Sequence, residues 1–333
     1  PALCRYCATG HEQLTVTSMA LLEKLSSSKK LNKVSSLGLT KWRSSNKIVE
    51  VLSTEVDVDK VSGPLAAHMQ FDLRELERGP EAPAYVIRQS VLTLLNSCLC
   101  TITDRPTVAH LLLGFTSLGT VLHVSEGSLY SKQMSLLHAI IDFLQSYPDE
   151  VEGNFLPWTI HLKRLAFEVL QHLWSSRLSS SFTLGEMRAN RFMLSMLASQ
   201  PIIGPNTLWD GFTVADEGFW FSDSISALAE FLLYRSHLYN YAATEIRAAA
   251  SSGSPTLQAE MLSTLLGNCT IEMGETILHP TVFDLFDFSD LDVGRLFKAP
   301  KLSLLDGINL DVCAKPVDSV IFYSPDELRE LVQ

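Results

Sequence analysis

Residues 157–175, PWTIHLKRLAFEVLQHLWS, carry apolar side chains at helical spacing on two different sides. One side is formed by Trp158, Leu162, Leu165, Ala166, Val169 and Leu173. The other side is formed by Phe167, Leu170 and Trp174. Pro157 suits the first turn of a helix, where its missing N–H would have no partner anyway. A helix that is apolar on two sides must be packed on two sides, so this segment predicts a helix in the interior of a helical array.

The same periodicity occurs earlier in the chain, again just after a proline, Pro83. Its apolar face consists of Ile87, Val91, Leu94, Leu95, Cys98 and Ile102. Further helices are predicted over residues 11–27, 46–53, 64–75, 106–115, 129–145, 184–199, 223–250 and 255–267. In the longest of these, Asp223 or Ser222 is the expected N-cap. Its expected apolar register is Ile225, Leu228, Leu232, Ser236, Tyr239, Ala243 and Ile246.

Strand signals are few and short. Polar and apolar residues alternate only in LGTVLHV, residues 118–124, and SVIFY, residues 319–323. Three long connections remain, at residues 31–45, 200–222 and 268–325. The last two are apolar for loops, so we expect them to pack over the helices.

This pattern predicts an all-α fold. Antiparallel helices of about 10 to 25 residues, with pairs spaced by roughly 30 to 45 residues, are typical of an irregular α-helical solenoid of the HEAT or armadillo type. A compact all-α bundle is the structural alternative. We expect one continuous solenoid segment over residues 1–333. It would have a helical stack at about 11–267 and a loop-rich acidic segment at about 268–325 packed on it.

Composition narrows the class of protein. The chain has 333 residues, of which 46% are hydrophobic and 19% charged, which indicates a well-buried globular fold rather than disorder. Its net charge of −11 disfavours general binding to nucleic acid backbones. The basic stretch at residues 24–48 is better explained as a solvated loop. No apolar run approaches the roughly 18 to 20 residues that span a bilayer. Because the sequence begins with proline and has no terminal tail, we expect a fragment of a longer protein.

No constellation of residues points to an enzyme, a cofactor site or a metal site. Glycine-rich phosphate loops and the nucleophile-elbow motif are absent from the sequence. Cys4, Cys7 and His11 resemble half of a zinc site, but no second pair stands at a suitable spacing. The six cysteines are scattered, as in the reduced interior of a cytosolic or nuclear protein. We therefore expect no catalytic residue, no metal and no cofactor.

The remaining polar candidates are interpreted individually. His161 and His172 share a rough helix face but stand too far apart to bind one ion. His110, within an apolar segment, is expected to be a hydrogen-bonded packing residue. We expect the single carboxylates to lie at solvated helix edges; these are Asp142, Glu168 and Glu230.

An aromatic loop offers two interpretations. Its aromatic residues are Trp209, Phe212, Phe219, Trp220 and Phe221. They could anchor a partner, for which Trp209, Phe212, Phe219 and Trp220 are the candidate residues. They could also fasten the loop onto the helices, which is the interpretation we favour.

Two stretches resemble a known family. The first is Arg105–Phe115, RPTVAHLLLGF, in which Pro106, His110, Gly114 and Phe115 stand out, and the second is TVFDLFDF from Thr281, with Phe283, Phe286 and Phe288. Both resemble the middle region of the giant scaffold nucleoporins of the nuclear pore inner ring. The order of the helices between them agrees with that region, so the resemblance extends over the entire chain.

The resemblance implies properties that periodicity does not show. The family builds a long α-helical solenoid related to nuclear transport receptors and has no enzymatic activity. It implies a place in the nuclear pore complex at the nuclear envelope, within the inner ring. Other scaffold nucleoporins, linker nucleoporins that bind through short motifs, and nuclear transport factors are the expected partners. The family's linker-binding surfaces lie mainly in flanking regions, so no partner-binding residue carries over here.

The segment HPTVFDLFDFSDL, residues 279–291, leaves three alternatives. A short helix would pack Phe283, Phe286 and Leu285 against neighbouring helices, with Asp284 and Asp287 facing solvent or capping a helix start. Alternation of Val282, Asp284, Phe286 and Phe288 would suit a strand, and an exposed segment would be a peptide bait for a partner. We favour the short helix, because it fits the solenoid.

The leading functional hypothesis is a structural scaffold segment of the nuclear pore inner ring. The alternative is a karyopherin-like transport receptor or another HEAT-type adaptor. Such receptors are expected to show regular repeats of roughly 40 residues with acidic inner helices. The irregular repeats and the acidic C-terminal region favour the scaffold.

Overall fold

The computed structural model describes residues 2–7, 9, 11–28, 47–70, 78–146, 148–151, 153–270, 276–278, 284, 314–317 and 320–323. The chain divides into two compact units, Pro1–Leu285 and Phe286–Gln333. The predicted packing of the segment at about 268–325 on the helices stays a prediction.

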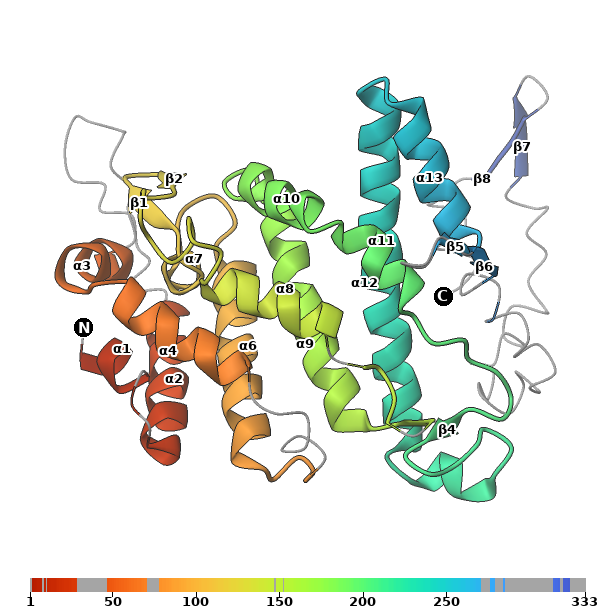
Figure 1. The fold of residues 1–333 in the computed structure, drawn as a ribbon, viewed down its shortest axis with the longest axis horizontal. Helices are drawn as coiled ribbons and strands as arrows, with labels where there is room; N and C mark the ends of the chain where they lie inside the picture. Colours follow the sequence, from red (N-terminus) through yellow and green to blue (C-terminus); the bar gives the residue numbers. More distant parts are fainter. Residues whose placement is uncertain are drawn as a thin grey trace. The chain divides into compact units, whose positions relative to one another are not determined.

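The described part of the chain is mainly α-helical, which confirms the predicted class (Figure 1). The helices are α1 Ala2–Cys7, α2 Glu12–Ser26, α3 Lys47–Glu55, α4 Asp59–Met69, α6 Pro83–Thr101, α7 Val108–Leu112, α8 Leu136–Ser146, α9 Pro157–Ser175, α10 Ser180–Ala189, α11 Phe192–Ala198, α12 Ser224–Ser251 and α13 Pro255–Leu265. A 3₁₀ helix, η1, spans Glu217–Phe221. The strands are β1 Thr116–Leu118, β2 Val121–His123, β3 Asn154–Phe155, β4 Leu208–Trp209, β5 Asn268–Thr270, β6 Thr276–Leu278, β7 Ala314–Val317 and β8 Val320–Tyr323.

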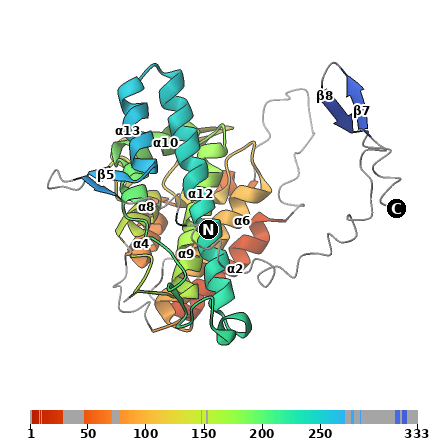
Figure 2. The same cartoon turned by 90° about the vertical axis from the view of Figure 1, so that its right-hand side faces the viewer.

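Within Pro1–Leu285 the longer helices form two layers. In the first layer α2 packs on α6, α6 on α9 and α9 on α12 (Figure 1). In the second layer α4 packs on α8, α8 on α11 and α11 on α13. Figure 2 shows α12 and α13 side by side at one end of this stack. This arrangement is an irregular α-helical solenoid.

The repeat is longer than the sequence indicated. The successive first-layer helices begin at Pro83, Pro157 and Ser224, so they are farther apart than the predicted 30 to 45 residues. Short elements placed between the layer helices account for the extra length. These are α7, the hairpin of β1 and β2, and α10.

The central helix α9 is packed on two sides, as its sequence predicted. It contacts α6 on one side and α12 on the other, and α8 and α10 also lie against it. Leu162, Phe167 and Leu170 are fully buried. Each such side chain contributes about 1.5 to 3 kcal/mol of burial free energy, so α9 is central to the stability of the stack.

The apolar register of α12 differs from the prediction. Of the expected face only Leu228 is buried, whereas Ile225, Leu232, Ser236 and Ala243 are exposed. The buried face consists mainly of Ala227, Phe231, Tyr234, Leu238, Tyr241 and Ala242. Aromatic side chains bury more apolar area than aliphatic ones, so the face that holds the aromatic residues is the one that packs on α9.

The predicted N-cap of α12 is only partly as expected. Asp223 occupies the N-cap position, but its side chain makes no capping hydrogen bond. The hydroxyl of Ser222 instead accepts a hydrogen bond from the backbone N–H of Ser224, at 3.4 Å.

Three other helix boundaries differ from the prediction. The helix expected at 64–75 begins at Asp59, and the helix expected at 129–145 begins only at Leu136. The segment 184–199 is two helices, because Arg191 has a left-handed backbone with φ of 48° and interrupts the helix between α10 and α11. The helix ends here because Arg191 has a non-helical φ. No glycine or proline at this position predicts the interruption.

The strands form two-stranded pairs. The predicted strand at 118–124 is an antiparallel hairpin, in which Thr116 pairs with His123 and the chain turns at Gly119. β8 confirms the strand predicted at 319–323 and pairs with β7. β3 and β4 form a two-residue parallel pair that ties the aromatic loop to the start of α9.

Among the described helices, none has both the length and the apolarity needed to cross a membrane.

Candidate interaction surfaces and polar networks

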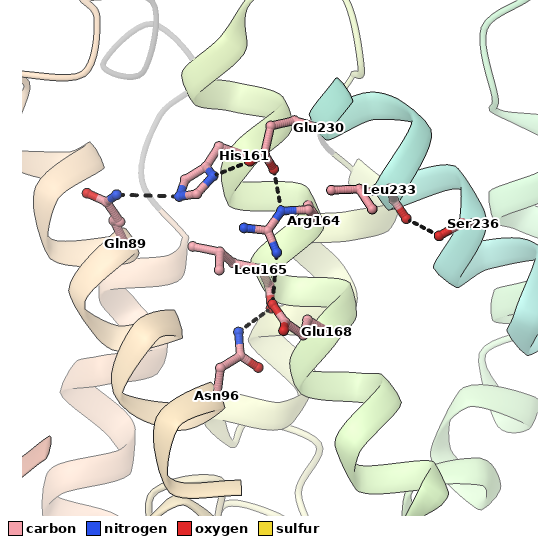
Figure 3. Close-up of polar contacts among 9 residues, drawn as sticks. All are labelled: Gln89, Asn96, His161, Arg164, Leu165, Glu168, Glu230, Leu233 and Ser236. Atoms are coloured by element: carbon pink, nitrogen blue, oxygen red, sulfur yellow. Dashed lines mark hydrogen bonds and ion pairs between the residues drawn. The ribbon is translucent and has the colours of Figure 1, made fainter. Parts of the chain in front are cut away.

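A polar network joins the three first-layer helices α6, α9 and α12 (Figure 3). His161 of α9 lies 3.2 Å from a carboxylate oxygen of Glu230 on α12 and 3.4 Å from the amide nitrogen of Gln89 on α6. Arg164, one turn farther along α9, donates to Glu230 and also to Glu168, at 2.9 Å. The prediction that Glu168 and Glu230 are single solvated carboxylates is therefore wrong, because they converge on one guanidinium.

The network determines the charge state of its acid. Burial by itself raises the pKa of Glu230, but the hydrogen bonds from His161 and Arg164 outweigh burial and lower the pKa overall. Burial lowers the pKa of His172 and of His237, which lie beside Glu168. A carboxylate that stays ionised between an arginine and a histidine acts as a clamp between helices.

A second network lies deeper, between the two layers. Lys163 donates to Asp149, and both side chains are almost fully buried. The amide of Gln200 lies 3.1 Å from Asp149 and 3.1 Å from the hydroxyl of Tyr234. Burial, together with the charge of Asp149, raises the pKa of Tyr234 well above its ordinary value. No local sequence pattern predicts this cluster, because its members come from four separate segments.

A third buried pair corrects an expectation about the segment around residue 284. Asp284 was expected to face solvent or cap a helix, but it is 3% exposed. Both of its carboxylate oxygens accept from Arg235 of α12, and one also accepts from the backbone N–H of Ile203 at 3.0 Å. A buried guanidinium needs a counter-charge, and Asp284 supplies it. Phe283, Leu285, Phe286, Asp287 and Phe288 lie outside the described residues.

The motif at Arg105–Phe115 is a packing device. Pro106 is buried, and the ring of His110 pairs with both the backbone N–H and the hydroxyl of Thr107 in a capping box that begins α7. Burial lowers the pKa of His110 to about 4. Gly114 has a φ of 100°, and a Cβ there would lie 2.8 Å from the Cβ of Ser135. Phe115 is fully buried, and its ring lies 5.0 Å from that of Tyr130.

The aromatic loop is held down by two of the four candidate residues. Trp209 and Phe219 are fully buried, and the Trp209 ring stacks on Phe155 at 4.5 Å. Phe212 is 38% exposed, and Trp220 is half-buried against Phe219. Binding of a partner by this loop stays a prediction, for which Phe212 and Trp220 present the accessible surface.

The residues of the possible half zinc site have local roles. Cys4 and Cys7 are buried in α1, and burial raises the pKa of the Cys7 thiol to about 12. His11 accepts a hydrogen bond from the backbone N–H of Leu14 and caps α2. The residues that the structure describes contain no group of three potential metal ligands.

A cavity of about 350 Å³ opens between α11, α12 and α13, and sequence analysis did not anticipate it. Its floor is formed by the buried side chains of Met187, Phe192 and Tyr241. Two ion pairs lie at its edge, Arg188 with Glu245 and Arg191 with Glu260.

Comparison with known proteins gives consistent results. The family model described as the nuclear pore complex scaffold, nucleoporins 186/192/205, matches residues 1–333. The chain is also similar to Nucleoporin NUP192 of Chaetomium thermophilum, with 28% identity over 313 residues. That match covers 93% of this chain but only 18% of the relative, so the chain spans less than a fifth of the relative's length.

Proposed function

This chain belongs to the nuclear pore complex scaffold family of nucleoporins 186/192/205, and we propose that it serves as a structural scaffold segment of the nuclear pore inner ring. In this role it presents a helical surface to other scaffold and linker nucleoporins at the nuclear envelope. It supports nucleocytoplasmic transport through architecture rather than by catalysis.

The observation that carries this proposal is an apolar stripe on α12 that lies on the opposite flank from α9. The stripe has large residues at one seven-residue spacing, Ile225, Leu232, Tyr239 and Ile246. Small residues follow at a second seven-residue spacing, Ala229, Ser236, Ala243 and Ala250. Six of these eight residues are exposed, and Tyr239 and Ile246 are partly exposed. Leu232 stands about half a turn around the helix from Glu230, which faces α9.

The seven-residue spacing favours a helix as the partner of this stripe. Apolar residues that recur every 3.5 positions form a seam along which a second helix packs at a crossing angle of about 20°. The α9 helix already has one neighbour on each flank, and a further helix on α12 would extend the layer in the same way. At the other end of the layer α2 exposes Leu14, Leu21 and Leu25. Both end helices of the layer are thus suited to contacts with further helices of a scaffold.

The test is capture from nuclear-envelope extract with the full 333-residue chain as bait, analysed by mass spectrometry. A scaffold segment should retain nucleoporins whether or not the GTP-bound transport GTPase is added. Release of bound cargo by that GTPase would instead identify a transport receptor and would overturn the proposal. Retention of no nucleoporin would also overturn it.

Two matched variants connect the capture to the stripe. Leu232 is 39% exposed, so Leu232→Glu should leave the thermal melt of the chain unchanged while weakening retention of the helical partner. Ser226→Glu adds the same charge at an exposed position outside the stripe and should retain partners like the wild type.

A further inference from the structure

The cavity between α11, α12 and α13 is apolar at its base and already formed. Met187, Phe192 and Tyr241 at the floor are at most 1% exposed, and Met193 and Met261 at the sides are at most 7% exposed. Its volume of about 350 Å³ lies at the lower end of the roughly 300 to 1,000 Å³ typical of binding pockets. A space of this size accommodates a large side chain of a partner rather than a whole helix.

The sequence explains why the space is open. Facing the cavity, α12 and its C-cap present the small residues Ala248, Ala249 and Ser252, whereas the first half of α12 buries Phe231 and Tyr234. The left-handed residue Arg191 ends α10 and starts α11 in a new direction, which places Arg191, Phe192 and Met193 at the cavity. A non-glycine residue in this conformation is strained, and such strain is concentrated at functional sites.

The lining favours an aromatic occupant. Three methionines contribute to the wall, and thioethers make favourable contacts with aromatic rings while adapting to their shape. Phe192 and Tyr241, whose rings lie 5.8 Å apart, offer edges and faces to a third ring. Leu257 is 40% exposed at the mouth and can cover an inserted ring.

The mouth of the cavity exposes two guanidinium groups, each of which is paired with a glutamate. The side chains of Arg188 and Arg191 are 50% and 69% exposed, whereas the partner carboxylate of Arg188, Glu245, is 3% exposed. Glu260, the partner of Arg191, is 49% exposed. An exposed pair of this kind is weak, so a carboxylate of another protein can replace Glu260 at little cost. Arginine offers five N–H donors, and Arg191 uses one nitrogen for Glu260.

We infer that this cavity, defined by Met187, Phe192, Met193, Tyr241 and Met261, binds a short linear segment of a partner protein. An aromatic side chain of that segment enters between α11 and α13, and acidic residues next to it pair with Arg191 and Arg188. The inference rests on the proposed function, because a scaffold segment works by presenting its surface to other proteins. Linear segments are commonly held by an aromatic anchor in a pocket and by charged pairs at the rim.

The first experiment uses methionine methyl NMR on the full 333-residue chain. The probe is a synthetic peptide with one central phenylalanine, two acidic residues on each side, and glycine and serine elsewhere. We expect its addition to shift the methyl signals of Met193 and Met261 and to leave that of Met134, which is 63% exposed outside the cavity, unchanged. Equal shifts at all three methyl groups, or none, would overturn the inference.

Two control peptides identify what is recognised. Replacing the phenylalanine by alanine should weaken binding about tenfold or more, as for a truncated anchor residue. Replacing the acidic residues by lysines should abolish the shifts. Binding of the alanine or the lysine version as strongly as the original would contradict an aromatic and acidic ligand. An equal response to free indole would assign the cavity to small apolar molecules instead.

Variants at Arg191 separate recognition from folding. Arg191→Gly removes one of the two arginines at the mouth and relieves the left-handed strain. It should therefore raise the melting temperature and weaken peptide binding about two- to fivefold. Arg191→Lys keeps the charge and should bind more tightly than Arg191→Gly. Glu260→Gln removes the competing carboxylate and should strengthen binding. Weaker binding of the peptide by Glu260→Gln would contradict the proposed pairing.

Failure of this inference can be distinguished from failure of the proposed function. If Arg191→Gly and a cavity-filling Ala248→Phe chain capture nucleoporins as the wild type does, the scaffold function stands and the cavity is not the contact. If the wild type captures none, the scaffold proposal itself fails.

Discussion

Arg235 of α12 and Asp284 form a buried ion pair in which each side chain is 1% exposed and the closest oxygen lies 2.8 Å from the guanidinium. The second nitrogen of Arg235 donates to the carbonyl of Pro201 at 2.6 Å. One arginine therefore fixes two separate segments, at residues 201–203 and at 284, to the long helix. Residues 201–203 belong to no helix or strand of their own.

Removal of one partner of this pair should strongly destabilise the fold. Asp284→Ala leaves a buried, unpaired guanidinium, and we expect a loss of about 3 to 5 kcal/mol in the free energy of unfolding. Chemical denaturation followed by circular dichroism measures it. Asp216→Ala is the control, because Asp216 is exposed and bonds only within its own turn. A loss below about 1 kcal/mol for Asp284→Ala would show that the pair is not formed.

A charge in the middle of α9 should unfold the chain. Leu165 is 8% exposed, and Leu165→Asp places an unpaired carboxylate between α9 and α6, at a cost on the order of several kcal/mol. Ser175→Asp adds the same charge to an exposed position on the same helix and should have little effect. A circular dichroism melt of Leu165→Asp identical to that of the wild type would contradict the position of α9 in the core.

Two glycine substitutions should change the stability of the chain in opposite directions. Gly114→Ala combines a positive φ with a Cβ 2.8 Å from that of Ser135, so we expect a loss of about 1 to 3 kcal/mol. Gly185→Ala lies within α10, where an added Cβ meets nothing within 4 Å, and should stabilise by up to about 1 kcal/mol. Differential scanning calorimetry of both variants measures whether the melting temperature falls for Gly114→Ala and rises for Gly185→Ala.

His110 should make the chain sensitive to mild acid. Its pKa falls from 6.5 to about 4 on folding, so between these values the unfolded chain binds a proton that the folded chain excludes. Stability is therefore complete above pH 6.5 and decreases as the pH falls towards 4, by about 3 kcal/mol for this group.

The measurement is the free energy of unfolding at several pH values for the wild type and His110→Asn. Asparagine can accept the hydrogen bond from Thr107 but does not titrate. The difference between the two proteins should change with pH only below about 6.5. A constant difference across this range would show that His110 is not excluded from protonation in the fold.

Glu230 contributes a second acid-sensitive element. Its pKa is lowered in the folded chain, so the stability it supplies is complete above its unfolded pKa and is lost as the pH falls through the lower, folded value. Glu230→Gln should remove that part of the acid dependence and loosen the contact between α9 and α12. Hydrogen exchange of α12 amides in the variant, compared with Thr244→Val on the same helix, measures the loosening.

Sequence alone predicted the elements whose signal is local. The two apolar faces of residues 157–175, the prolines that begin α6 and α9, and the hydrogen-bonded packing role of His110 all arise from neighbours within one or two turns. The register of α12 could not be predicted in this way, because two faces of the helix are apolar. Which of them is buried depends on the side chains of α9 against which it packs. The ring of Tyr234 goes inside with Lys163 and Asp149, and this determines which stripe remains outside.

The polar networks and the cavity required the structure. Arg235 and Asp284 are separated by 49 positions, and Arg164 and Glu230 by 66, so nothing in the local pattern pairs them. The cavity depends on the left-handed Arg191, at a position where sequence rules expect glycine or asparagine. Its best sequence signal was the small residues Ala248, Ala249 and Ser252, which line the cavity and cannot fill it.

The double packing of α9 has a practical consequence for dissecting this chain. Because α9 packs on both α6 and α12, a fragment that lacks α9 would leave the apolar face of α6 or of α12 uncovered. Fragments that end near residue 156 or begin near residue 176 should therefore aggregate when expressed, whereas those that retain α6, α9 and α12 together should remain monodisperse. Limited proteolysis should likewise spare the region from Pro157 to Ser175 and cut elsewhere first.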